Sequence, residues 1–154
     1  GVQLPEGAPE QTRARMWRDH PGVEEGEPPA FARAAAQRIA GLLGGQGDDL
    51  ADLPLDMERI PEFHRRVYAI TRAIPPGQVR TYGDIARELG EPGASRAVGR
   101  ALGLNPFAPV IPCHRVLAAG GRAGGFSAEG GAQTKLRMLE IERACLGGGP
   151  GLFD

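Results

Sequence analysis

Proline and glycine interrupt this chain so often that any helix it forms must be short. The 154 residues include 24 Gly and 14 Pro, together about a quarter of the chain. That share approaches the level typical of disordered sequences. However, 41% of the residues are apolar and the net charge is only −1, which argues against a wholly disordered chain. We therefore expect one ordinary globular domain of short elements, or one domain with a small companion.

Charge is distributed unevenly along the chain. Residues 1–60 carry 6 basic and 11 acidic side chains, whereas residues 61–143 carry 12 basic and 7 acidic ones. Seventeen of the 18 basic residues are Arg. A basic block joined to an acidic one indicates an anionic partner for the second block, with an ordinary solvated surface as the alternative.

Cysteine usage points to a reducing compartment. The two cysteines, Cys113 and Cys145, do not form a Cys-x-x-Cys pair, so we expect reduced thiols in a cytoplasmic protein. No apolar run approaches the roughly 18 residues of a membrane span, and no secretory signal is visible. No Cys/His set has zinc spacing, so we predict neither a metal nor a membrane partner.

The first third of the chain carries no cluster of catalytic residue types, and we interpret it as a structural scaffold. Residues 1–28 are rich in Pro, Gly and Glu, with a short helix possible over 10–19 and a strand stub at 1–4. Pro28-Pro29 precedes an Ala-rich helix that extends to about Leu43 and carries Phe31 on its apolar stripe. Gly44-Gly45 then ends the helix, and residues 46–56 form an acidic linker.

The next segment predicts a helix-turn-helix unit. A helix begins near Pro61 and stops at Pro75-Pro76-Gly77. Thr81 and Asp84 have capping-box spacing, which predicts a short helix over 83–89. A break over 90–93 separates it from a second helix over 94–104.

The second helix of this unit is built mostly of Ala, Gly and Ser, with Arg96 and Arg100 one turn apart. A helix that reads the major groove usually carries several long polar side chains. Small residues with a lone long Arg instead favour close, sequence-tolerant docking in the minor groove. The alternative is a tightly packed helix pair with surface arginines.

Cys113 and His114 stand side by side between apolar flanks. Adjacent side chains point apart on a strand or helix, so His114 is expected to reach the thiol through a water or a tight turn. A Gly-rich loop over 120–131 follows, and then a helix over 134–143 that offers Glu140 and Glu142 as partners to orient a histidine.

These motifs resemble a known family. The Pro112–Val116 segment, preceded by Asn105-Pro106 and by the helix of residues 95–99, looks like the O(6)-alkylguanine-DNA alkyltransferases, also called methylated-DNA–protein-cysteine methyltransferases. The resemblance covers residues 63–143. It implies a mainly helical α+β fold: a DNA-binding and alkyl-transfer domain at 61–146 with the helix-turn-helix, preceded by a reduced N-terminal segment at 1–60 and followed by a flexible tail at 147–154.

The resemblance also implies catalytic roles. Cys113 matches the thiol that accepts the alkyl group, and His114 matches the water-linked base. Glu142, chosen over Glu140, matches the carboxylate that orients the histidine. Asn105 matches the hinge between the DNA-binding helix and the active-site turn. Such an arrangement would raise the thiolate fraction of Cys113, which for a free thiol is a few per cent at neutral pH.

Substrate contacts follow from the same resemblance. Tyr82 matches the residue whose hydroxyl approaches N3 of the flipped guanine. Arg96 matches the arginine finger, which enters the base stack and takes the place of the extruded nucleotide. The carbonyls of Cys113 and Val116 would recognise the exocyclic amine. The remaining expected contacts are Phe126 (Tyr in many members) and Ser127 in the pocket wall, and Ser95, Ala97 and Arg100 on the DNA-binding helix.

The implied activity is irreversible transfer of an alkyl group from O(6)-alkylguanine in double-stranded DNA to Cys113, once per molecule and without a cofactor. We expect a monomer of bacterial type, associated with the nucleoid when bound to DNA. Three alternatives are a lesion-binding module without chemistry, a Cys-dependent hydrolase that turns over, and a sequence-reading helix-turn-helix repressor. The related alkyltransferase-like proteins lack this cysteine, so Cys113 argues against assigning the chain to them.

Overall fold

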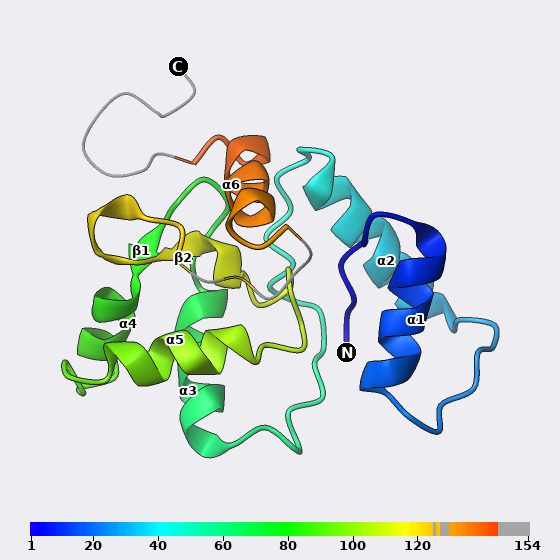
Figure 1. Cartoon of the computed structure of the whole chain (residues 1–154), viewed down its shortest axis with the longest axis horizontal. Coiled ribbons are helices and arrows are strands. Elements are labelled where there is room, and N and C mark those ends of the chain that lie inside the picture. Colours follow the sequence, from blue (N-terminus) through cyan, green and yellow to red (C-terminus); the bar gives the residue numbers. More distant parts are fainter. Residues whose placement is uncertain (125, 127–129, 145–154) are drawn as a thin grey trace.

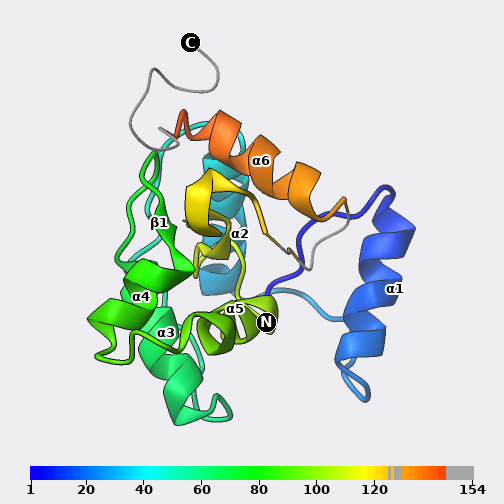
Figure 2. The ribbon, with the colours of Figure 1, turned by 60° about the vertical axis from the view of Figure 1, so that its left-hand side comes forward.

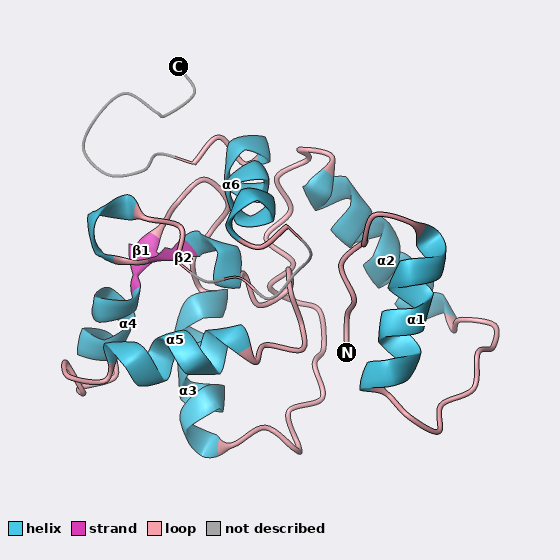
Figure 3. Ribbon diagram, viewed as in Figure 1, coloured by secondary structure: helices cyan, strands magenta, loops and turns pink. Residues whose placement is uncertain are grey.

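The computed structural model describes residues 1–124, 126 and 130–144, and the described part is mainly helical (Figures 1 and 3). Cys145 and Ser127 lie outside the described residues. None of the described helices is long and apolar enough to cross a membrane. The described elements, in chain order, are α1 (Pro9–Asp19), α2 (Ala30–Leu43), α3 (Glu62–Arg72), β1 (Arg80–Thr81), α4 (Tyr82–Glu88), α5 (Ser95–Gly103), the 3₁₀ turn η1 (Cys113–Arg115), β2 (Val116–Leu117), the 3₁₀ turn η2 (Ala119–Gly121) and α6 (Ala132–Ile141).

Local sequence signals account for the helix boundaries. The capping box at the start of α4 is present: the Asp84 amide donates to the Thr81 hydroxyl at 3.1 Å, and the Thr81 amide donates to the Asp84 carboxylate at 2.7 Å. Helix α3 ends before Pro75-Pro76, and Gly77 follows with a φ of +84°, a conformation that favours glycine. The predicted helices are therefore confirmed to within one or two residues.

Packing makes α3, α4 and α5 one unit. Helices this short are marginal alone, and here they bury a shared core that includes Val67, Ile85 and Val98. The Tyr68 hydroxyl donates to the carbonyl of Ala101 at 2.8 Å and thereby ties α3 to α5. Figure 1 shows α4 and α5 as the predicted helix-turn-helix, with α3 beneath them.

A two-stranded parallel sheet joins the helix-turn-helix to the segment around Cys113. Arg80 pairs with Val116 and Thr81 pairs with Leu117. Because β1 runs directly into α4 and β2 directly follows η1, this small sheet places Tyr82, the first residue of α4, near the Cys113 turn.

The N-terminal part differs from two expectations. Residues 1–4 form no strand; instead, the Val2 amide donates to the Pro106 carbonyl at 2.9 Å, and Leu4 is buried. Phe31, expected on the apolar stripe of α2, is 71% exposed, whereas Leu42 at the other end of the helix packs against Leu50. Figure 2 shows α1 standing apart from α3, α4 and α5.

Candidate active site

Cys113 is the first residue of the η1 turn and lies in the protein interior. Its side chain is 5% exposed and belongs to the core cluster that also contains Ile111 and Val116. Its amide donates to the Ile111 carbonyl at 2.8 Å. The backbone of the η1 turn is therefore held in place by this hydrogen bond, and it positions the Cys113 thiol in the interior.

Asn105 connects the end of α5 to this turn. Its Nδ2 donates to the Ile111 carbonyl at 2.8 Å, and its Oδ1 accepts from the Phe107 amide at 2.9 Å. The Asn105 side chain also acts on the Cys113 thiol, whose pKa it lowers. These contacts are consistent with the hinge position that the family resemblance implies for Asn105.

His114 and Glu142 meet in the interior. The His114 Nε2 and the Glu142 Oε1 are 2.7 Å apart, and the two side chains are 0% and 3% exposed. Glu140, the other candidate, instead accepts a hydrogen bond from Arg137 at 2.6 Å on the surface. The structure thus brings Glu142, and not Glu140, to the histidine.

The charge state of this pair follows from its surroundings. Burial raises the pKa of Glu142, but hydrogen bonds from His114 and Arg115 outweigh it and bring that pKa down to about 2. Burial lowers the pKa of His114, partly opposed by Glu142. A carboxylate only accepts hydrogen bonds, so we infer that Nε2 of a neutral His114 carries the proton. Its Nδ1 has no hydrogen-bond partner among the described residues and is left as an acceptor.

The Cys113 thiol is protonated in this resting arrangement. Burial raises its pKa, and the smaller opposing effects of Asn105, Lys135 and the backbone amides of Cys113 and His114 do not reverse the shift. Desolvation of the free thiol therefore opposes the increase in thiolate fraction that the resemblance implies.

Lys135 is a site residue that the sequence analysis missed. Its side chain is buried, and its Nζ donates to the Val116 carbonyl at 2.6 Å and to the Tyr82 hydroxyl at 3.3 Å. Burial lowers its pKa to about 8. The Val116 carbonyl, expected to recognise the guanine amine, is thus already an acceptor for Lys135. One signal was available: Lys135 is the single lysine among 18 basic residues.

Tyr82 forms one wall of this cluster, and burial raises the pKa of its hydroxyl. The backbone of Gly124, with a φ of +64°, passes so close that a Cβ there would lie 3.0 Å from the Tyr82 hydroxyl. Phe126 is half-buried and packs against the core cluster that contains Cys113. Glycine at position 124 therefore allows the loop to close against Tyr82.

The surface of α5 matches its amphipathic sequence. Val98, Ala101 and Leu102 are buried, whereas Arg96 and Arg100 are exposed and make no ion pair within the described residues. The other two residues expected to bind DNA, Ser95 and Ala97, are half-buried beside them.

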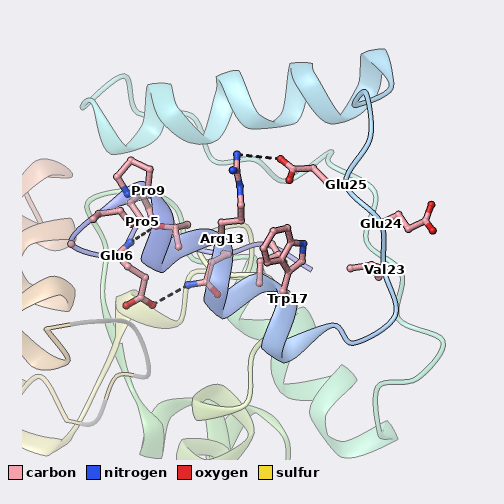
Figure 4. A pocket seen from close by; sticks show the side chains of 13 residues that line it. Pro5, Glu6, Pro9, Arg13, Trp17, Val23, Glu24 and Glu25 are labelled. Atoms are coloured by element: carbon pink, nitrogen blue, oxygen red, sulfur yellow. Dashed lines mark hydrogen bonds and ion pairs between the residues drawn. The ribbon is translucent and has the colours of Figure 1, made fainter.

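A separate cavity lies between α1 and the loop that follows it (Figure 4). Its volume is about 630 Å³, and Arg13 spans it to pair with Glu25 at 3.2 Å. Trp17 forms part of its lining and is half exposed. None of the predicted site residues lines this cavity. Among the described residues, no cluster of three or more His, Cys, Asp or Glu side chains could hold a metal ion.

Comparison with known proteins identifies the family. The sequence pattern of the DNA-binding domain of 6-O-methylguanine DNA methyltransferase matches residues 62–144. The chain belongs to the methylated-DNA–protein-cysteine methyltransferase family. The match contains α3 to α6 and with them the Cys113, His114 and Glu142 cluster.

Relatives and solved structures of the family agree with this. A methylated-DNA–protein-cysteine methyltransferase of Mycolicibacterium paratuberculosis is 42% identical over 127 residues, which are 82% of this chain and 74% of the relative. One from Methanosarcina acetivorans is 38% identical over 75% of this chain and 71% of its own length. The crystal structure of Mycobacterium tuberculosis OGT in complex with DNA is 39% identical, with a TM-score of 0.64, and the alignment covers 75% of this chain and 70% of that one.

Proposed function

We propose that this protein repairs DNA by transferring an alkyl group irreversibly from O(6)-alkylguanine to the Sγ of Cys113. The observation that carries the proposal is the buried Cys113 turn beside His114, whose Nε2 lies 2.7 Å from Glu142, next to a helix-turn-helix. The family relationship supports it, since a relative of the same fold has been crystallised with DNA. We assign DNA binding and transfer to residues 61–146 and a supporting role to residues 1–60.

The first half of the chemistry is deprotonation of the thiol. The Nδ1 of His114 is an acceptor that a water molecule can link to the Cys113 Sγ. The thiol proton passes to His114, and Glu142 stabilises the resulting imidazolium. Because the thiol is protonated at rest, we expect deprotonation only once a substrate fills the pocket.

The second half is transfer. The sulfur attacks the alkyl carbon, an S–C bond forms, and the C–O(6) bond breaks with its electron pair going to the guanine. Tyr82 donates a proton toward N3, and the neighbouring Lys135 ammonium can replace that proton. The alkyl group remains on Cys113, so each molecule acts once and no cofactor is required.

DNA binding supplies the substrate to this pocket. The oxygen that carries the alkyl group is inside the duplex, so the nucleotide must rotate out at a cost of a few kcal/mol. We propose that α5 docks in the minor groove as part of a monomer, that Ser95, Ala97 and Arg100 face the backbone, and that Arg96 enters the vacated stack. A reduced Cys113 fits action in the cytoplasm, at the nucleoid.

Mass spectrometry of the intact protein mixed with an O(6)-methylguanine duplex tests the proposal, with Cys113→Ser as the matched control. We expect the mass to increase by one methylene, at most once per molecule, on the peptide that contains Cys113. Binding of DNA without an adduct would instead support a lesion-binding module. Repeated turnover of a thioester without an adduct from DNA would support a hydrolase.

A further inference from the structure

Arg115 is a charged side chain buried within the site, and no role has been given to it above. It is 1% exposed. Its Nε donates to the Glu142 Oε2 at 2.9 Å and its Nη2 to the Glu142 Oε1 at 2.8 Å. Its Nη1 donates to the carbonyl of Ile74, just after α3, at 2.6 Å. The guanidinium is therefore fixed by three hydrogen bonds, two of them to one carboxylate.

This pairing changes what Glu142 does to His114. A buried carboxylate with only a histidine as partner favours the protonated, cationic ring, because a charge in the interior requires an opposite charge. Burial has the largest effect on the pKa of His114 and lowers it; Glu142 opposes burial and raises that pKa, and the charge of Arg115 counters Glu142 and lowers it. The charge of Glu142 is already matched by Arg115, so His114 has no need to become cationic at rest.

We propose that Arg115 is a positioning residue for alkyl transfer: it holds Glu142 as a charge-compensated carboxylate, so that His114 stays neutral with Nδ1 free to receive the thiol proton. This inference rests on the proposed function and adds a residue to it. A cationic His114 would have both ring nitrogens protonated and could not accept that proton.

The hydrogen bond from Arg115 to the Ile74 carbonyl also helps to orient the Glu142 carboxylate. Arg115 joins Ile74 to Glu142, the residue that follows α6. The turn after Ile74 also approaches α6, since a Cβ on Gly77 would lie 3.4 Å from the Glu142 carbonyl oxygen. Arg115 thus anchors the carboxylate to the segment that follows α3 as well as neutralising it.

The pH dependence of the reaction with free O(6)-benzylguanine separates this role from simple structural support. The charged groups that act on His114 are Glu142, Arg115 and Lys135, and the titratable Cys113 precedes it in the chain. In Arg115→Met, the uncompensated negative charge of Glu142 should raise the pKa of His114. We expect the acidic limb of the rate profile to move to higher pH by roughly one pH unit or more. In Arg115→Lys, the restored positive charge should move the acidic limb most of the way back to its original pH, although the paired hydrogen bonds to Glu142 are lost.

Arg137→Met is the matched control, because Arg137 pairs with Glu140 on the exposed side of α6. It should retain the acidic limb of the unmodified protein. An Arg115→Met protein that is less stable but has an unchanged acidic limb would overturn the proposal and leave Arg115 a structural role only.

A second measurement does not depend on any variant folding or on alkyl transfer. Nitrogen-15 NMR of the imidazole distinguishes protonated from unprotonated ring nitrogens, and we expect His114 at neutral pH to be neutral, with the proton on Nε2. A doubly protonated ring, or a proton on Nδ1, would overturn the inference about Arg115. If the ring has the expected state but O(6)-benzylguanine does not react, the proposed function fails while the assignment of the His114 proton stands.

Discussion

Lys135, on α6, donates a hydrogen bond to the carbonyl oxygen of Val116, the first residue of β2, at 2.6 Å. This single contact places a buried ammonium 3.3 Å from the Tyr82 hydroxyl, where it can lower the cost of proton donation by the tyrosine. In the proposed mechanism, His114 takes the proton of the thiol, and Tyr82 with Lys135 supplies a proton to the guanine.

Replacing Lys135 by Met should slow alkyl transfer about tenfold, the effect of losing roughly 1.4 kcal/mol of transition-state stabilisation. Tyr82→Phe should have a similar effect, and the double variant should be little slower than either single one, since both changes break the same proton path. Single-turnover rates with saturating O(6)-benzylguanine measure this. Fully multiplicative losses would show that the two residues act independently.

Arg96→Ala should reduce repair of an O(6)-methylguanine duplex by about ten- to a hundredfold, because an empty stack makes nucleotide rotation less favourable by a few kcal/mol. Its reaction with free O(6)-benzylguanine should stay within about twofold of the unmodified protein, since Arg96 is exposed on α5 and does not line the Cys113 core. The control is Arg137→Ala, which removes an exposed arginine from α6. Equal losses of activity on both substrates would show that Arg96 does not fill the vacated base stack.

DNA affinity should fall with salt. With a small number of phosphate contacts from α5 and its surroundings, the slope of log K against log salt should be roughly −3. Fluorescence anisotropy with an unmodified duplex measures it, and Arg100→Ala should make the slope shallower by about one. A flat response would contradict DNA as the anionic partner of the basic half.

Acid should destabilise the protein through Glu142. Its pKa is about 2 in the folded protein and 4.5 as an ordinary glutamate, so the unfolded chain binds the proton more readily. The stabilisation is therefore fully present above pH 4.5 and is lost as pH falls toward 2, by roughly 2 to 3 kcal/mol. Denaturant unfolding across that range should show a steeper loss for the unmodified protein than for Glu142→Gln. Parallel curves would mean that Glu142 is not the group responsible.

Sequence reasoning succeeded where a signal is local. The Thr81–Asp84 capping box and the Pro75-Pro76-Gly77 stop fix α4 and the end of α3 with neighbouring residues alone. The strand expected at residues 1–4 is wrong because a strand needs a partner, and the described contact of this segment is with Pro106.

The site was only partly predictable for a similar reason. The resemblance pointed to Cys113, His114 and Glu142, and the structure brings the last two into contact. Arg115 and Lys135 were missed because a charged residue is ordinarily expected on the surface. Their burial depends on acceptors from distant segments, Ile74 for one and Val116 for the other.

The burial of Cys113 has a consequence for storage. A protein that reacts once must wait, sometimes for the whole life of the molecule, with its sulfur intact. Oxidants and adventitious electrophiles react with exposed thiolates, and Cys113 at rest is neither exposed nor ionised. We therefore expect the packing around Cys113 to protect its sulfur from peroxide and glutathione disulfide until an alkylated base reaches the site.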